Sequence, residues 1–209
     1  KDTFAGNCNT NVIPDAFVNN RKKTHIVIDP GHIVNDLGID CLEKLGQEMK
    51  QDGLDIKDVG LVINTHSHRD HCESSQPLQE RNKAVVAVGE LEAEYYETIG
   101  RRRYQSRGGI HVPDLVPDMK IKIGDWKLEG LTLRVILIPG HTPGHIGLYW
   151  AEKRTLLVGD VIFYHNTGRV DLPKGNGDHL RDSIERLSQL DVEYLLTGHQ
   201  YEGPGVISG

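Results

Sequence analysis

Three histidines and one aspartate lie within six consecutive residues near the middle of the chain, in the stretch HSHRDH that begins at His66. Neutral imidazole nitrogens and carboxylate oxygens are the ligands that zinc, iron and manganese prefer in catalytic sites. Surface histidines in a polar loop are the alternative, but that alternative does not explain so dense a cluster. The stretch therefore predicts a metal site.

Three later segments each place one ligand-type residue just after a predicted strand. His141 lies in the turn PGHTPGH, Asp160 in a Gly-Asp pair and His199 in a Gly-His pair. A glycine beside each residue lets backbone or metal approach closely. Each segment is weak evidence by itself, because a Gly-Asp pair after a strand is more often a simple turn. Together with the HSHRDH stretch, the segments indicate that several strand ends converge on one site.

The strand that leads into the HSHRDH stretch is expected at 61–65, where the chain has no charged residue and is rich in β-branched residues. Alternate side chains of a strand share a face, so His66, His68 and Asp70 would point together if the extended backbone continued. His71 would then add a fourth ligand from the turn where the strand ends.

Strands and helices alternate along the rest of the chain. We expect strands at 25–28, 84–88, 120–123, 131–138, 146–150, 155–158 and 193–197, and helices at 38–51, from about 72, at 90–98 and at 178–190. The stretch 100–117 contains three consecutive arginines, paired glycines and prolines, which favour a long loop. Elements interleaved in this way predict a layered α/β arrangement. No linker divides the chain, so we expect one domain over 1–209.

The bulk properties exclude several classes of protein. A net charge of −6 gives no broad cationic field for nucleic acid or an anionic membrane. No run approaches the roughly 20 apolar residues of a membrane helix, and no secretory pattern is visible at the start. The spacing of Cys8, Cys41 and Cys72 matches neither a disulfide framework nor a metal knuckle. We therefore expect reduced thiols and, by default, a cytoplasmic protein.

The ligand-bearing segments resemble, in their order, the motifs of the metallo-β-lactamase superfamily. The matching elements are HSHRDH, PGHTPGH and the Gly-Asp and Gly-His pairs, and Asp29-Pro30-Gly31 resembles the loop after an early strand of the family. The resemblance implies a four-layer αββα sandwich with a metal site at one edge, between two sheets. The ligands it implies are His66, His68 and His141 for one metal, Asp70, His71 and His199 for the other, and Asp160 as the bridge.

Within the superfamily, the closer likeness is to the hydroxyacylglutathione hydrolase (glyoxalase II) group. The run GDVIF from Gly159, followed by GRVDLP from Gly168, resembles that group's GDxLF and GRxDLP segments. Thr197 stands where the family usually has proline, and the chain ends ten residues after His199. The helical C-terminal domain that binds glutathione in longer hydrolases is therefore not seen, which puts glutathione thioesters in doubt more than the metal chemistry.

The resemblance implies a metal-dependent hydrolase that cleaves a small thioester, ester or lactone. Two divalent ions, zinc first and iron or manganese as alternatives, would lower the pKa of a shared water, and the resulting hydroxide would attack a carbonyl carbon. Asp70 would bind metal and orient that hydroxide. Residues expected to contact the small-molecule substrate are His32, Tyr164, His165 and Arg169.

Several neighbouring residues have a structural explanation beside a functional one. His145 is expected to make a structural hydrogen bond rather than to bind metal. Cys72 is expected to pack at a helix start, and the arginines at 101–103 to face solvent. For His32, a surface loop explains the residue as well as a place at the rim of the site.

Other activities of the superfamily stay open. Persulfide dioxygenases resemble the same group and use one iron held by two histidines and an aspartate, which would be His66, His141 and Asp160 here. Oxygen uptake with a persulfide would distinguish this activity from hydrolysis. The acidic charge disfavours a phosphodiesterase or nuclease, and the GRVDLP segment disfavours a β-lactamase. A metal-binding protein without catalysis is disfavoured by the complete set of ligands.

Overall fold

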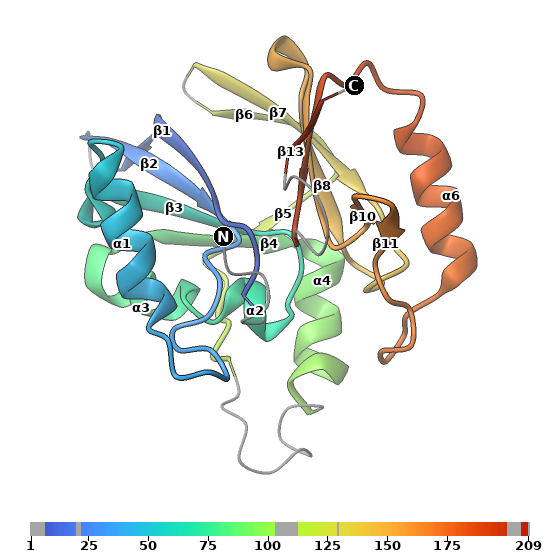
Figure 1. Cartoon of the computed structure of the whole chain (residues 1–209), viewed down its shortest axis with the longest axis horizontal. Coiled ribbons are helices and arrows are strands. Elements are labelled where there is room, and N and C mark those ends of the chain that lie inside the picture. The colour runs from blue at the N-terminus through green and yellow to red at the C-terminus, as the bar shows by residue number, and fades with distance from the viewer. Residues whose placement is uncertain (1–6, 20–21, 103–112, 129, 200–205, 209) are drawn as a thin grey trace.

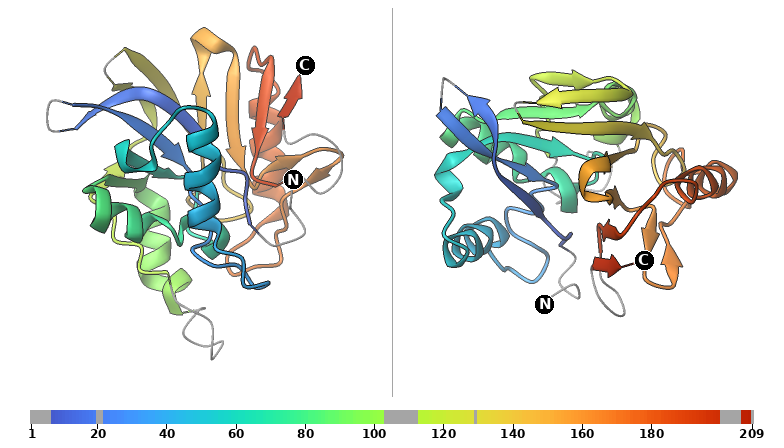
Figure 2. Two further views of the ribbon diagram at one scale, coloured as in Figure 1. Left: turned by 60° about the vertical axis from the view of Figure 1, so that its left-hand side comes forward. Right: turned by 90° about the horizontal axis from the view of Figure 1, so that it is seen from above.

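The computed structural model of the chain describes residues 7–19, 22–102, 113–128, 130–199 and 206–208. Two β-sheets lie against each other and helices cover their outer faces, so the predicted four-layer αββα sandwich is confirmed (Figure 1). Figure 2 shows the layers from two further sides. One apolar cluster fills the space between the sheets. A second lies between the first sheet and its helices, and a third lies between the second sheet and its helix.

The first sheet has the strand order β1-β2-β3-β4-β5. Its strands are β1 (Asn11–Asn19), β2 (Lys22–Ile28), β3 (Val59–Asn64), β4 (Val85–Gly89) and β5 (Met119–Ile121). β1 is antiparallel to β2, and the other neighbours pair in parallel. Every residue of β3 is buried, as expected for a parallel strand that is covered on both faces. In β2, Ile26 and Ile28 face the second sheet whereas Val27 packs under the helices.

The second sheet has the strand order β13-β12-β9-β8-β7-β6. Its strands are β6 (Gly124–Leu128), β7 (Leu131–Leu137), β8 (Ile146–Trp150), β9 (Thr155–Gly159), β12 (Tyr194–Thr197) and β13 (Val206–Ser208). β12 is parallel to β9, and the other neighbours are antiparallel. A separate hairpin of β10 (Ile162–Phe163) and β11 (Asn166–Thr167) follows β9.

Helices cover the outer face of each sheet. The helices on the first sheet are α1 (Cys41–Gln51), α2 (Arg69–Cys72), α3 (Ser75–Asn82) and α4 (Glu90–Tyr95), and α6 (Gly177–Leu187) covers the second. Asp40 caps α1 and Asn176 caps α6, each by accepting hydrogen bonds from backbone N–H groups of the first turn. Among the described residues, none of the helices has the length and apolar character that a membrane span needs.

Two predictions about strands are corrected. The expected strand at 120–123 is wrong, because β5 ends at Ile121 and β6 begins at Gly124 in the other sheet. Gly124 has a φ of 123°, which favours glycine, and the chain crosses between the sheets there. β1 was not expected, because Pro14 breaks its pattern and the pairing with β2 shifts between Ile13 and Phe17.

The expected long loop at 100–117 begins later than predicted. The helical backbone of α4 continues through a π-helical turn (Tyr96–Gly100) and includes Arg101 and Arg102. Both arginines are exposed, and Arg101 lies 3.5 Å from the carboxylate of Asp114, which agrees with a solvated face. Residues 103–112, with the third arginine, lie outside the described ones.

Candidate metal centre

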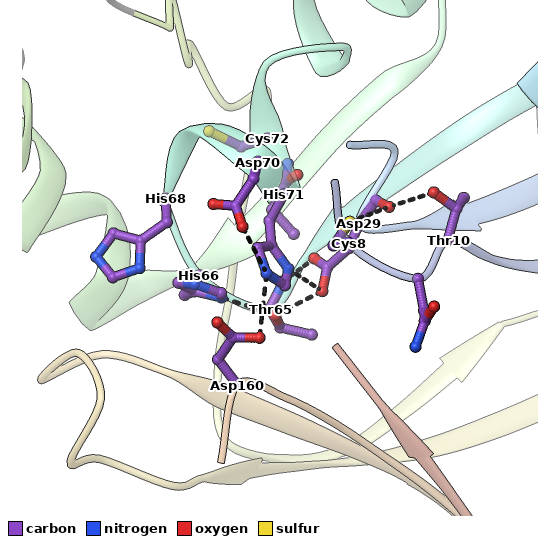
Figure 3. A network of polar contacts seen from close by, with 12 residues as sticks. Cys8, Thr10, Asp29, Thr65, His66, His68, Asp70, His71, Cys72 and Asp160 are labelled. Atoms are coloured by element: carbon purple, nitrogen blue, oxygen red, sulfur yellow. Dashed lines mark hydrogen bonds and ion pairs between the residues drawn. The ribbon is translucent and has the colours of Figure 1, made fainter. Parts of the chain in front are cut away.

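All the predicted ligands come together at one end of the sandwich, where strands of both sheets end. The HSHRDH stretch follows β3, Asp160 follows β9, His199 follows β12, and His141 lies in the turn between β7 and β8. Figure 3 shows the side chains of Asp70, His71 and Asp160 turned toward one another, with His66 beside them and His68 to one side. The convergence that was expected from four separate segments is therefore present.

The ligand atoms form two groups of three. In the first group, one nitrogen each from His66, His68 and His141 lie within 4.8 Å of one another. The second group consists of Asp70, His71 and His199, whose ligand atoms also lie within 4.8 Å of one another. Three or four nitrogen and oxygen donors are what a catalytic zinc or iron ion takes from a protein. Each group could therefore hold one ion.

Asp160 lies between the two groups. Its Oδ2 is 3.5 Å from Nε2 of His141 in the first group and 3.5 Å from Nε2 of His199 in the second. Its Oδ1 is 3.2 Å from Nε2 of His71 and accepts no hydrogen bond, although it is buried. The Asp160 carboxylate can thus contact an ion in either group.

The HSHRDH stretch reaches the site by a different backbone path from the one expected. β3 ends at Asn64, the chain bends at Thr65 and His66, and α2 begins at Arg69 directly after His68, whose backbone is extended. The prediction that Asp70 shares a strand face with the two preceding histidines is therefore wrong. Asp70 and His71 project from a helical turn, which places them in the second group.

The arrangement of donor atoms fits bound cations. Nδ1 of His71 is 2.9 Å from Oδ2 of Asp29, so the neutral ring carries its proton there, and Nε2 presents a lone pair. This Nε2 faces Oδ1 of Asp160 at 3.2 Å (Figure 3). It also faces Nε2 of His199 at 3.3 Å. Nε2 of His66 is buried and has no hydrogen-bond partner. Facing lone pairs repel one another unless a proton or a metal ion lies between them.

In the metal-free protein, protons must take the place of a metal in the second group. Burial disfavours the imidazolium form of His71, but the nearby carboxylates, Asp160 foremost, raise its pKa well above the ordinary value. Burial likewise opposes protonation of His199, yet Asp160 and Asp70 raise its pKa to about 9. The second group therefore concentrates negative charge that a cation neutralises.

The first group behaves in the opposite way. Burial lowers the pKa of His68 to about 3, with repulsion from His141 as the next cause. Burial also lowers the pKa of His66 and of His141. These three rings are neutral at physiological pH, which is the form that binds metal.

We predict that metal binding at neutral pH releases protons from His71 and His199, because ligation requires neutral imidazole. The pKa of His199 is about 9 when folded and 6.5 ordinarily. Its stabilisation of the metal-free fold is therefore complete below pH 6.5 and disappears as the pH rises through about 9. Metal affinity should increase over the same range. Calorimetric titration in two buffers of different ionisation enthalpy measures the released protons, and an enthalpy independent of the buffer would contradict this prediction.

Asp29 orients His71. Its Oδ2 accepts hydrogen bonds from Nδ1 of His71 at 2.9 Å and from Oγ1 of Thr65 at 2.7 Å, and its Oδ1 accepts one from the Thr65 N–H at 2.7 Å. Asp29 is close enough to His66 and His71 to form a further triplet, but its oxygens are already engaged. An orienting role is therefore the better explanation. The sequence marked the Asp29-Pro30-Gly31 loop without revealing this role.

Replacing Asp29 with Asn should weaken metal binding about 10- to 100-fold, because an outer partner that fixes a histidine ligand is lost. Asn tolerates the left-handed backbone of this residue, whose φ is 51°. Asp15→Asn is the matched control, since Asp15 has the same φ but is exposed. Competition with a chromophoric chelator measures the affinity. Equal affinities of the two variants would rule out the orienting role.

His141 is oriented by the backbone of Arg169. Nδ1 of His141 donates to the Arg169 carbonyl at 2.7 Å, which leaves Nε2 facing the first group. The guanidinium of Arg169 is exposed and pairs with Asp171. A substrate contact of the Arg169 side chain stays a prediction, and its carbonyl contact was not foreseen.

His145 makes the structural hydrogen bond that was predicted. Its Nε2 accepts from the N–H of Asp160 at 3.2 Å, and its ring stacks on that of His66 with centroids 4.6 Å apart. Both contacts support groups of the site. His145 thus fixes the backbone that carries Asp160.

The remaining predicted substrate residues lie in different surroundings. His32 is only 5% exposed and its Nδ1 lies 2.8 Å from Oε2 of Glu73, so the surface-loop explanation is wrong. Tyr164 and His165 are exposed at the turn of the β10–β11 hairpin, with ring centroids 4.1 Å apart. Cys72 is buried, but it lies at the end of α2 and not at the start of a helix as expected. A substrate role for the first three residues stays a prediction.

Comparisons with known proteins agree with this geometry. Residues 10–199 match the family model described as the metallo-β-lactamase superfamily. A probable metallo-hydrolase of Methanocaldococcus jannaschii is 29% identical over 85% of this chain and 83% of its own. The hydroxyacylglutathione hydrolase GloC of Haemophilus influenzae is also 29% identical, over 85% of this chain and 81% of its own.

Solved structures share the fold. The crystal structure of TTHA1623 in a di-iron-bound form has a TM-score of 0.72 and 28% identity, over 96% of this chain and 89% of its own. The BLEG-1 B3 metallo-β-lactamase has a TM-score of 0.74 and 24% identity, over 96% and 88%, which bears on the fold alone. This chain belongs to the metallo-β-lactamase superfamily.

Proposed function

We propose that this protein is a hydrolase with two divalent metal ions that cleaves a small thioester, ester or lactone. The observation that carries the proposal is the position of Asp160, whose carboxylate faces both groups of ligand atoms. A binding protein for one ion would need no carboxylate shared between two groups. Ions held in such a pair of sites supply Lewis acidity and bring the pKa of bound water toward neutrality.

The proposed ligands follow the two groups. His66, His68 and His141 hold the first ion, Asp70, His71 and His199 hold the second, and Asp160 bridges them. Zinc is the proposed metal, because it accepts mixed imidazole and carboxylate donors and leaves a position open for water. Iron and manganese suit the same donors, and the di-iron form of a protein with 28% identity supports iron as the first alternative.

The residues around the ligands orient the reacting groups. Asp29 and the carbonyl of Arg169 hold the rings of His71 and His141 with their proton on Nδ1 and their Nε2 toward the site. The Asp70 side chain is 28% exposed, whereas all the other proposed ligands are buried. Asp70 is thus placed to accept a hydrogen bond from the attacking water and to orient it toward a carbonyl carbon.

The relatives support a thioester as the first substrate class to try. The GloC protein, which carries the name hydroxyacylglutathione hydrolase, matches over most of its length. The chain spans about half the length of other hydroxyacylglutathione hydrolases, such as that of Rhodospirillum rubrum at 32% identity. We therefore propose hydroxyacyl thioesters as a class and leave the thiol part of the substrate open.

The test is a substrate screen with the zinc-loaded protein, scored by kcat/KM on hydroxyacyl thioesters, simple esters and lactones. Hydroxyacylglutathione and a thioester of a smaller thiol are compared directly. We expect thioester hydrolysis that a chelator abolishes and added zinc restores. Metal binding without hydrolysis of any of these classes would contradict the proposal, and oxygen consumption by the iron-loaded protein with a persulfide would replace it with the one-iron alternative.

A further inference from the structure

Glu92 of α4 is a buried carboxylate that joins two loops of the site. Its side chain is fully buried, at 0% exposure. Oε1 accepts hydrogen bonds from the N–H of Ser67 at 2.8 Å and from its Oγ at 2.6 Å, and Oε2 accepts one from Oγ1 of Thr142 at 2.7 Å. Ser67 lies between the two histidines that follow β3, and Thr142 directly follows His141.

Each oxygen of the Glu92 carboxylate accepts hydrogen bonds from a loop of a different sheet. Ser67 extends from β3 of the first sheet, whereas Thr142 lies between β7 and β8 of the second. The first ligand group is divided in the same way, because His66 and His68 come from one sheet and His141 from the other. The spacing of its nitrogens therefore depends on how these two loops are held together.

The packing around α4 strengthens the connection. A Cβ atom on Gly144 would lie 2.1 Å from the backbone nitrogen of Glu92, so only glycine lets the turn of the second sheet approach α4 so closely. Further along α4, the hydroxyl of Tyr95 donates to the carbonyl of Pro173 at 2.9 Å, in the loop that follows Arg169.

The hydrogen-bond donors of Glu92 are neutral hydroxyl and amide groups. A buried carboxylate is costly even with such donors, but a neutral amide could not replace it, because an amide has only one oxygen that accepts hydrogen bonds. Burial raises the pKa of Glu92, whereas the hydrogen bonds from Ser67 and Thr142 lower it. In the carboxylate form, Glu92 places a negative charge against the neighbours of His66, His68 and His141, which favours a cation in the first group.

We propose that Glu92 is a positioning residue, which holds His66 and His68 at the correct distance from His141 and so sets the metal affinity of the first ligand group. This inference rests on the proposed dinuclear site and adds a residue that touches neither metal nor substrate. Among the described residues, the Glu92 carboxylate makes no hydrogen bond or ion pair with the second ligand group, so the effect is expected at the first group.

The test compares variants by zinc affinity and stoichiometry, measured by competition with a chromophoric chelator. Glu92→Gln keeps the shape, removes the charge and replaces one accepting oxygen with an NH2 group. Thr142→Val removes one hydrogen bond, whereas Thr142→Ser keeps it. Glu94→Gln is the matched control, since Glu94 is exposed on the same helix. We expect one of the two zinc ions to bind about 10- to 100-fold more weakly in Glu92→Gln and less severely so in Thr142→Val. Thr142→Ser and Glu94→Gln should bind both ions as the unchanged protein does.

Two results would overturn the role of Glu92. Unchanged affinity for both ions in Glu92→Gln and Thr142→Val is the first. Equal weakening of both ions, together with a lower Tm of the metal-free variant, is the second, because it indicates a merely structural role. If Glu92→Gln does not fold, the pair Thr142→Val and Thr142→Ser still decides the question. Failure of the unchanged protein to bind two ions would contradict the proposed function instead.

Discussion

Replacing Asp160 with Asn should lower kcat/KM about 1,000-fold and reduce the bound metal to about one equivalent, because the Lewis acidity of a metal pair contributes several kcal/mol and each 1.36 kcal/mol is tenfold in rate. Asn has the size of Asp but no charge. Nε2 atoms of His71, His141 and His199 would then lose the anionic partner that lies within 3.5 Å of each. Repulsion between two ions without a bridging carboxylate would remove one of them.

The control for this variant is Asp52→Asn, which changes an exposed aspartate after α1. Elemental analysis gives the metal content of both variants, and steady-state kinetics on the best thioester gives kcat/KM. Retention of both ions and of full activity by Asp160→Asn would show that Asp160 does not bridge. Loss of metal with an unchanged Tm of the metal-free protein would separate a ligand role from a folding defect.

Removing the metal should lower the Tm of the protein by about 10 °C. Ligands that bind only the native state stabilise it by about 4 kcal/mol when their free concentration is 1,000 times Kd. In a chain of this size, each kcal/mol shifts Tm by roughly 2–4 °C. The structural cause is the cluster of facing lone pairs and carboxylates at the end of the sandwich, which repel one another without a cation.

Differential scanning calorimetry before and after dialysis against a chelator measures this shift, and added zinc should restore the original Tm. Asp160→Asn should show a smaller shift than the unchanged protein, because it binds less metal. The same Tm with and without metal would mean that the ligand groups are satisfied by protons alone. That result would argue against tight metal binding at both groups.

The proximity of the proposed ligands could be predicted from the sequence, because the segments that carry them all follow strands. The orienting residues could not be predicted. Glu92 lies between two exposed glutamates, Glu90 and Glu94, so the sequence indicates an ordinary solvated helix start. Its contacts with Ser67 and Thr142 span 25 and 50 residues of chain, and only the packing of α4 brings them together.

The fold was predictable where apolar runs are uninterrupted, as in β3, β4 and β9. It was not predictable where local geometry breaks the pattern. Pro14 and a register shift hide β1, and Gly124 divides an alternating run between two sheets. The start of α2 at Arg69 likewise leaves no periodic pattern in the sequence, although it determines which of the two ligand groups contains Asp70.

The most direct test of the account is the metal content of protein purified without added metal, measured by elemental analysis and referred to protein concentration. The account predicts about two equivalents of zinc, or of zinc and iron together, per chain, as two separate ligand groups require. One equivalent of iron with little zinc would contradict the dinuclear site and favour oxygen chemistry. Less than about a tenth of an equivalent, not recovered on adding metal, would contradict the metal site altogether.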